Sequence, residues 1–219
     1  MSATLPPEEL DALVEGFAHL GVDLGPGEQR AVLAILGVLA GGRPVTPRSL
    51  AERIGWSVAD AEDLLARLPR CETDDLDRIV GCSGLSLRPT PHALAIGHNL
   101  VHAWCAWDAL YLAVALDAAI EVSSTCPVTG RTVAVGVTPD GVERRRPPTT
   151  LVAFVPPERT SPDRVRGEFC SMVHFLADDE AARDWTDRVP ESFVLTLDDA
   201  FEVGRRAILR RYGDALTGG

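Results

Sequence analysis

The chain has 219 residues, a formal net charge of −11, 46% hydrophobic residues and 24% charged residues. These values are ordinary for a globular protein with one large domain or two small ones. The acidic balance argues against binding to nucleic acid or to acidic membranes, because both require clustered cationic surface. All 21 basic residues are Arg, and the absence of Lys excludes Schiff-base and P-loop chemistry.

Membrane and export signals are not expected in this chain. No apolar run approaches the roughly 20 residues of a membrane span. The acidic, Pro-containing segment 1–10 lacks the basic and apolar regions of a signal peptide. We therefore predict a cytoplasmic protein with no membrane partner. In that compartment all five cysteines are expected to be reduced thiols, and their odd number fits disulfide pairing poorly.

The first ninety residues are predicted to be mostly helical. Apolar residues at helical spacing predict helices over residues 8–20 and 28–39. Thr46 and Ser57 are suitable N-caps for two further helices, one ending near Gly55 and one running from residue 58 to about 68. Two short helices around a Gly-containing turn form a helix-turn-helix. Alternating apolar residues within 77–87 predict a small hairpin that would make it a winged helix.

The helix-turn-helix allows two interpretations. DNA recognition requires Arg, Asn or Gln on the second helix. Here that helix begins with Asp60, Glu62 and Asp63, and residues 44–70 carry no net positive charge. We therefore interpret the motif as a packing module and expect no nucleic-acid partner.

The second half of the chain mixes predicted helices and strands. Apolar runs and Pro/Gly punctuation predict helices over 100–116, 178–188 and 197–211 and strands over 119–123, 132–137 and 151–155. The run 168–176 is compatible with a strand or a helix. The predicted fold class is α+β, with an N-terminal helical, winged-helix-like domain (1–90) and a C-terminal α+β domain (91–219) of short, mostly antiparallel strands.

Metal-cage and protease patterns are weak in this sequence. Structural zinc sites use close Cys or His pairs, and the nearest matches are His102-x2-Cys105 and Cys170-x3-His174. Unpaired buried Cys and His are the commoner origin of such spacing. No orienting Asn or Asp can be placed for a cysteine protease, and Cys105 is not at a recognisable helix start.

The segment 100–108 carries the best candidate chemistry. On a helix, Cys105 and Asp108 share one face. Trp104 and Trp107 would exclude water there and raise the pKa of the Asp108 carboxyl, which makes it a candidate proton donor. A semi-exposed Cys and a solvated Asp remain the alternative interpretation from spacing alone.

Three motifs, in order and spacing, resemble the organomercurial lyase family: Trp104-Cys105-Ala106-x-Asp108, Val122-Ser123-Ser124-x-Cys126-x-x-Thr129-Gly130 and Phe169-Cys170-x-x-Val173-His174-Phe175. The similarity extends from about residue 30 to 210. It implies that Cys105 and Cys170 are the mercury-binding thiols and that Asp108 is the acid, while Cys126 is structural. This chain departs from the family pattern at Ser171, where a second Cys is frequent, and at Trp107, where a smaller apolar residue is common.

The resemblance implies protonolytic cleavage of carbon–mercury bonds for mercury detoxification. No cofactor would be required, and the product Hg²⁺ would stay on Cys105, Cys170 and Asp108 until external thiols or a mercuric reductase removed it. The organomercurial is the implied partner, and the chain is expected to be a monomer or a homodimer. The alternatives are a metal-responsive winged-helix regulator and a relative that binds soft metals without cleaving anything.

Overall fold

The structure is a computed structural model that describes residues 5–18, 20, 23–68, 71–157, 160 and 164–217. Its helices are α1 (Pro7–Ala18), α2 (Pro26–Ala40), α3 (Pro47–Ile54), α4 (Val58–Arg67), α5 (Ala106–Leu116), α6 (Asp179–Arg188) and α7 (Leu197–Thr217). A π-helical turn, η3 (Val165–Phe169), leads directly into a 3₁₀ turn, η4 (Cys170–Met172). None of the described helices is both long and apolar enough to cross a membrane.

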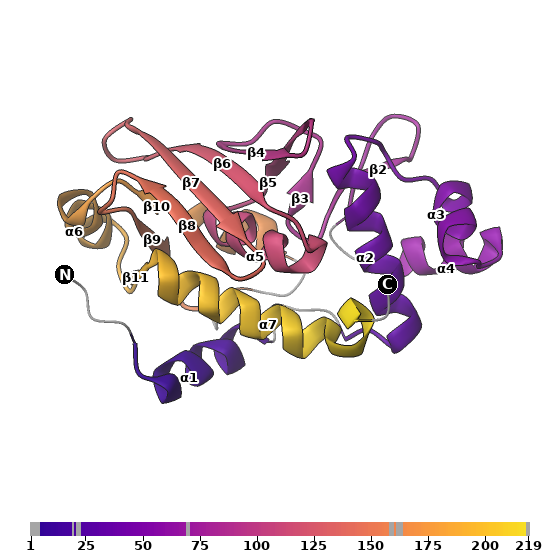
Figure 1. Ribbon diagram of the computed structural model, residues 1–219, viewed down its shortest axis with the longest axis horizontal. Coiled ribbons are helices and arrows are strands. Elements are labelled where there is room, and N and C mark those ends of the chain that lie inside the picture. Colours follow the sequence, from indigo (N-terminus) through magenta and orange to yellow (C-terminus); the bar gives the residue numbers. More distant parts are fainter. Residues whose placement is uncertain are drawn as a thin grey trace.

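The strands form two antiparallel sheets (Figure 1). The larger has eight strands in the order β1-β2-β3-β5-β4-β6-β7-β8, and the smaller has three in the order β10-β9-β11. The strands are β1 (Glu72–Thr73), β2 (Ile79–Cys82), β3 (Leu85–Ser86), β4 (His92–Ile96), β5 (Asn99–Ala103), β6 (Ile120–Thr125), β7 (Thr132–Thr138), β8 (Gly141–Arg146), β9 (Leu151–Phe154), β10 (Phe175–Leu176) and β11 (Phe193–Thr196). The α+β class predicted from the sequence is confirmed.

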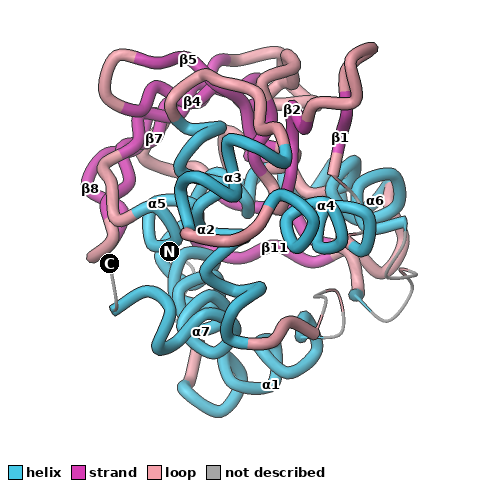
Figure 2. Tube along the Cα trace, turned by 90° about the vertical axis from the view of Figure 1, so that its right-hand side faces the viewer, coloured by secondary structure: helices cyan, strands magenta, loops and turns pink. Residues whose placement is uncertain are grey.

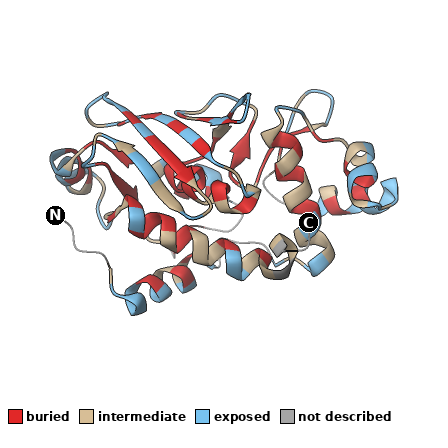
Figure 3. Ribbon diagram, viewed as in Figure 1, coloured by how far each residue is buried: buried red, intermediate tan, exposed pale blue. Residues whose placement is uncertain are grey.

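Helix α5 lies at the centre of the molecule. It contacts strands of the large sheet on one side and α7 on the other. Figure 2 shows the strands of that sheet on one side of the molecule and α1 and α7 on the opposite side. Eight of the 11 residues of α5 are buried and the other three are partly exposed, whereas α7 buries only one face (Figure 3). A helix that is apolar all round must be enclosed, so the fold places α5 where water is excluded.

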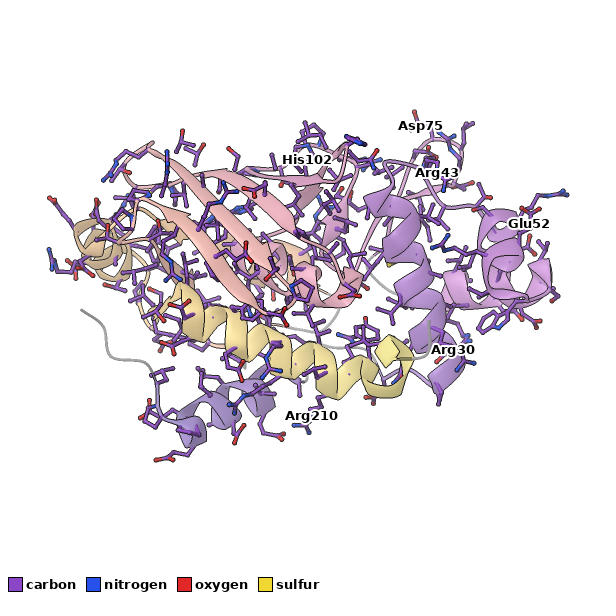
Figure 4. The ribbon with its side chains drawn as sticks, viewed as in Figure 1. Arg30, Arg43, Glu52, Asp75, His102 and Arg210 are labelled. Carbon is purple, nitrogen blue, oxygen red and sulfur yellow. A yellow bond between two sulfur atoms is a disulfide. The ribbon has the colours of Figure 1, made fainter. Side chains whose placement is uncertain are left out.

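Ion pairs attach α1 to the outer face of α7. Arg206 lies 2.6 Å from Asp11, and Arg210 pairs with Glu15. Figure 4 labels Arg210 on the side of α7 that faces α1. Exposed pairs contribute little each, so the apolar side of α1, with Val14 and Phe17 buried, supplies most of the attachment.

The predicted helix-turn-helix helices are present. Thr46 caps α3 through its side chain, which accepts from Ser49 N at 3.1 Å, and Gly55 ends α3 in the left-handed conformation. Ser57 caps α4 in the same way. The predicted hairpin is also present as β2 and β3, but these strands continue the large sheet through β5. The sheet therefore takes strands from both sides of residue 90, and the winged-helix description and the domain division there stay predictions.

The helix predicted over 100–116 is wrong in its first part. Residues 99–103 form β5, which pairs with β3 and β4, and the helix begins only at Ala106. The expectation of five reduced thiols is also corrected, because Cys71 and Cys82 form a disulfide with Cα atoms 4.3 Å apart. The antiparallel pairing of β1 with β2 brings these two residues together. This pairing cannot be recognised from the spacing of the two cysteines in the sequence.

Candidate active site

Cys105 is the N-cap of α5. Its backbone is extended, and its Sγ accepts a hydrogen bond from Asp108 N at 3.4 Å. The sequence-based view that Cys105 is not at a helix start is therefore wrong. A cap residue and the third helical residue face one another across the first turn, so the Cys105–Asp108 spacing does bring thiol and carboxyl together.

Cys170 reaches the same place from a distant segment. It begins η4, and the chain that follows is fixed by a backbone hydrogen bond from Ala106 N to Val173 O at 3.1 Å. Ligand atoms of Cys105, Asp108 and Cys170 all lie within 4.8 Å of one another, and all three residues are buried. Within the described part of the chain this is the one group of three such residues that could hold a metal ion.

A cavity of about 390 Å³ opens next to these groups. Asp108 and Cys170 line it, together with Trp107 and Phe169 from the site segments and residues from α1, α2 and α7. Trp107 is held by a hydrogen bond from its Nε1 to Ala200 O at 3.0 Å. The cavity therefore offers a partly aromatic space in which an organic group can lie against the Cys170 thiol and the Asp108 carboxyl, with the Cys105 sulfur within 4.8 Å of both.

Asp108 has one oxygen engaged and one unengaged. Oδ1 accepts a hydrogen bond from Tyr111 Oη at 2.5 Å, while Oδ2 is buried without a hydrogen-bond partner among the described residues. Burial raises the pKa of Asp108 to about 6, against the opposing effects of Tyr111 and the two thiols. At neutral pH the carboxyl can therefore both take up and give back a proton.

Both thiols hold their protons at neutral pH. Burial, followed by the neighbouring Cys170 and Asp108, raises the pKa of Cys105 well above its ordinary value. Cys105 lowers the pKa of Cys170, but burial and the Asp108 charge outweigh this and the net direction is upward. Thiolates form here when a soft cation takes the place of the proton.

The tip of the β2–β3 hairpin closes one side of the site. Ser83 and Gly84 both have positive φ, as a two-residue type I′ turn requires. Gly84 O accepts from Trp104 N at 2.9 Å. A Cβ at Gly84 would lie 2.7 Å from both Asp108 Oδ1 and Tyr111 Oη, so only glycine fits.

Sequence reasoning assigned no role to Tyr111 or to Gly84. Tyr111 lies one helical turn after Asp108, and that spacing is a signal that could have found it. Gly84 lies in the turn between β2 and β3, and its close approach to Asp108 on α5 joins two segments whose contact cannot be recognised from sequence spacing.

The other candidate ligands lie elsewhere. Cys126 is buried as a free thiol and does not line the cavity. His102 Nδ1 accepts from Thr90 N at 3.3 Å, and the His174 ring packs on Trp185 at 5.0 Å. Neither histidine belongs to the group of Cys105, Asp108 and Cys170. The two spaced pairs, His102–Cys105 and Cys170–His174, therefore do not combine into a zinc site.

Known proteins resemble this chain across most of its length. A family model described as alkylmercury lyase matches residues 85–208. An alkylmercury lyase of Staphylococcus epidermidis is 37% identical over 84% of each chain, and one of Streptomyces lividans is 36% identical over 78% of each. The crystal structure of the mercury-bound form of MerB2 has a TM-score of 0.73 and 25% identity, covering 92% of this chain and 99% of that one. The chain therefore belongs to the alkylmercury lyase family, enzymes that cleave carbon–mercury bonds.

Proposed function

We propose that Cys105, Cys170 and Asp108 perform this cleavage, in which RHg⁺ and H⁺ give RH and Hg²⁺. The observation that carries the assignment is the meeting of two thiols and one carboxyl within 4.8 Å, beside a cavity of about 390 Å³. Soft mercury(II) binds sulfur in preference to oxygen or nitrogen. Two sulfurs and one proton donor are the minimum that the reaction needs.

The first step replaces a thiol proton by mercury. As the sulfur of Cys105 or Cys170 binds RHg⁺, its proton passes to the ionised carboxylate of Asp108. With its pKa raised to about 6, the carboxylate is available at neutral pH yet basic enough to accept the proton. The unengaged Oδ2 is the oxygen that can receive it.

The second step cleaves the carbon–mercury bond. The second thiol binds mercury and gives up its proton as the released H⁺, and the added sulfur ligand moves electron density from mercury toward carbon. Asp108 then delivers its proton to carbon as the C–Hg bond breaks. The balance is RHg⁺ plus two Cys–SH giving RH, a Hg(S-Cys)₂ product and one H⁺. No electron is gained or lost by the protein, so no redox cofactor is invoked.

Release of the product needs other sulfur ligands. We expect external thiols, R′SH, to displace Hg²⁺ as Hg(SR′)₂ and to return one proton to each cysteine. A mercuric reductase as acceptor, a cytoplasmic location, a requirement for no cofactor, and a monomeric or homodimeric state are further predictions of this proposal.

The test is release of hydrocarbon. Methylmercury with excess thiol should give methane in the headspace over repeated turnovers. Cys105→Ser and Cys170→Ser should abolish it, whereas Cys126→Ser, a matched change of a buried thiol outside the cavity, should retain it. Asp108→Ala should bind methylmercury without releasing methane.

Two results would contradict the proposal. Full turnover by Cys170→Ser would remove the second thiol from the mechanism. Normal methane production by Asp108→Ala would remove the carboxyl. A soft-metal binder or a metal-responsive regulator would release no methane at all, and the regulator would instead show salt-dependent DNA binding.

A further inference from the structure

A second pair of sulfurs begins at the wall of the same cavity, where Cys82 lies, and continues through its disulfide to Cys71. Cys82 lines the cavity along with Ser83 and Gly84, at the hairpin tip that packs on Asp108. Cys82 is bonded to Cys71, which is partly exposed, whereas Cys82 itself is buried. The pair therefore extends from the site toward the protein surface.

We propose that Cys71 and Cys82, when reduced, form a second Hg²⁺ site that takes the product from Cys105 and Cys170. The inference rests on the proposed function, because it requires Hg²⁺ to form at the first site. The disulfide form is closed to metal, and the dithiol form is an internal acceptor. Neither cysteine is needed for cleavage itself.

Geometry favours these two residues as ligands for one ion. Their Cα atoms are 4.3 Å apart, and rotation about each Cα–Cβ bond can place the two sulfurs on opposite sides of a metal. Backbone pairing between Cys82 and Leu85 fixes one partner, and pairing of Glu72 with Gly81 fixes the chain next to the other. A fixed dithiol needs little reorganisation to bind a soft ion.

Position gives the pair an advantage over thiols in solution. Mercury exchanges between sulfurs by direct attack of a new sulfur on the metal, so the acceptor must enter the cavity. A sulfur already on the cavity wall acts at a high effective concentration. Because Cys71 is partly exposed, external thiols can then collect the ion there without entering the cavity.

Both chemical steps balance. Reduction consumes two low-molecular-weight thiols, R′SH, and gives R′SSR′ and two Cys–SH. Transfer breaks the two Hg–S bonds to Cys105 and Cys170 and forms two to Cys71 and Cys82. Two protons move from the accepting thiols to the donating sulfurs, and no electrons are exchanged with mercury.

The experiment counts methane per chain without external thiol. Full-length protein is reduced, freed of reductant without oxygen, and given methylmercury in one-equivalent steps. We expect two equivalents of methane from the reduced protein. We expect one from the protein with the Cys71–Cys82 disulfide intact, and one from the Cys71→Ser/Cys82→Ser variant. Cys126→Ser, the matched control, should again give two when reduced.

One equivalent from the reduced protein would overturn the inference, as would two equivalents from either the disulfide form or the double variant. The comparison of reduced and disulfide-bonded wild type decides the matter even if the double variant does not fold. Assays with excess external thiol separate the two proposals. There wild type and Cys126→Ser should release methane over repeated turnovers, whereas failure of the proposed function would leave every form without methane.

Discussion

Tyr111 Oη donates a hydrogen bond of 2.5 Å to Asp108 Oδ1 from one turn along α5. Burial and the neighbouring Asp108 charge raise the pKa of Tyr111 well above its ordinary value, so the phenol stays protonated and remains a donor. The bond occupies one carboxyl oxygen and leaves Oδ2 for proton transfer. In the proposed mechanism Tyr111 therefore determines which carboxyl oxygen takes up the proton, and its hydrogen bond lowers the pKa of Asp108.

Removing this donor should shift the pH dependence of cleavage. Tyr111→Phe deletes a bond that stabilises the carboxylate, so the pKa of Asp108 should rise above about 6. A hydrogen bond to a charged group is worth about 1.5–3 kcal/mol, which corresponds to a rise of about 1–2 pH units. The acidic limb of the pH–rate profile for methane release should move to higher pH by that amount. Tyr212→Phe, which changes another tyrosine lining the cavity, should leave the limb in place; equal shifts in both variants would count against the role of Tyr111.

The buried carboxyl should cost stability above its pKa. Its folded-state pKa of about 6 exceeds the ordinary value of 3.8, so the folded state binds the proton more tightly. Stability contributed by this group is therefore present at low pH and is lost as the pH rises from about 4 to about 6. Relative to wild type, the free energy of unfolding of Asp108→Asn should rise by about 2 kcal/mol between pH 4 and pH 7. Urea unfolding at the two pH values measures this, and a pH-independent difference would contradict it.

Gly84 should not tolerate a side chain. Gly84→Ala would place Cβ 2.7 Å from Asp108 Oδ1 and Tyr111 Oη, at a φ of +93°. We expect a loss of at least about 2 kcal/mol in the free energy of unfolding, together with a fall in the rate of methane release. Gly97→Ala is the matched control, because its φ is +57° but nothing lies within 4 Å of its Cβ position. That variant should lose about 1 kcal/mol and keep its activity; an equal loss of activity in both would assign the effect to backbone strain alone.

His92 should make the fold sensitive to acid. Burial, with a smaller effect of His174, lowers the pKa of His92 to about 3, and its Nδ1 lies 2.9 Å from Ser124 Oγ. The unfolded chain binds the proton near pH 6.5 and the folded chain does not, so stability falls as the pH drops below about 6.5. Through His92, the free energy of unfolding of wild type should fall by about 2 kcal/mol as the pH drops from 7 to 5. His92→Asn should lose correspondingly less over that interval in chemical unfolding.

Local sequence signals predicted much of the secondary structure. The caps at Thr46 and Ser57 and the left-handed Gly55 act within a few residues, so their effect is visible in the sequence. The apolar run from Leu100 was misassigned because length and hydrophobicity do not distinguish a buried strand from a buried helix. Pairing with β3 and β4 decides that it is a strand.

The candidate site was only partly predictable. Cys105 and Asp108 could be paired from their spacing, whatever the exact start of the helix. Cys170 could not, because the bond between Ala106 and Val173 that brings it near joins segments far apart in the chain. Only resemblance to a family linked it to the other two. The Cys71–Cys82 disulfide could not be predicted from the sequence either, because it depends on how β1 and β2 pair.

The cavity is completed by residues from near both ends of the described chain. Phe17 lies on α1, and Ile208 and Tyr212 lie on α7. During synthesis on the ribosome, α7 is made after Cys105 and Cys170, so both thiols exist before this wall of the cavity does. A nascent chain in a cell containing mercury therefore offers its thiols to the metal before it can fold. The yield of active enzyme should thus fall when synthesis and exposure coincide, and enzyme made beforehand should be spared.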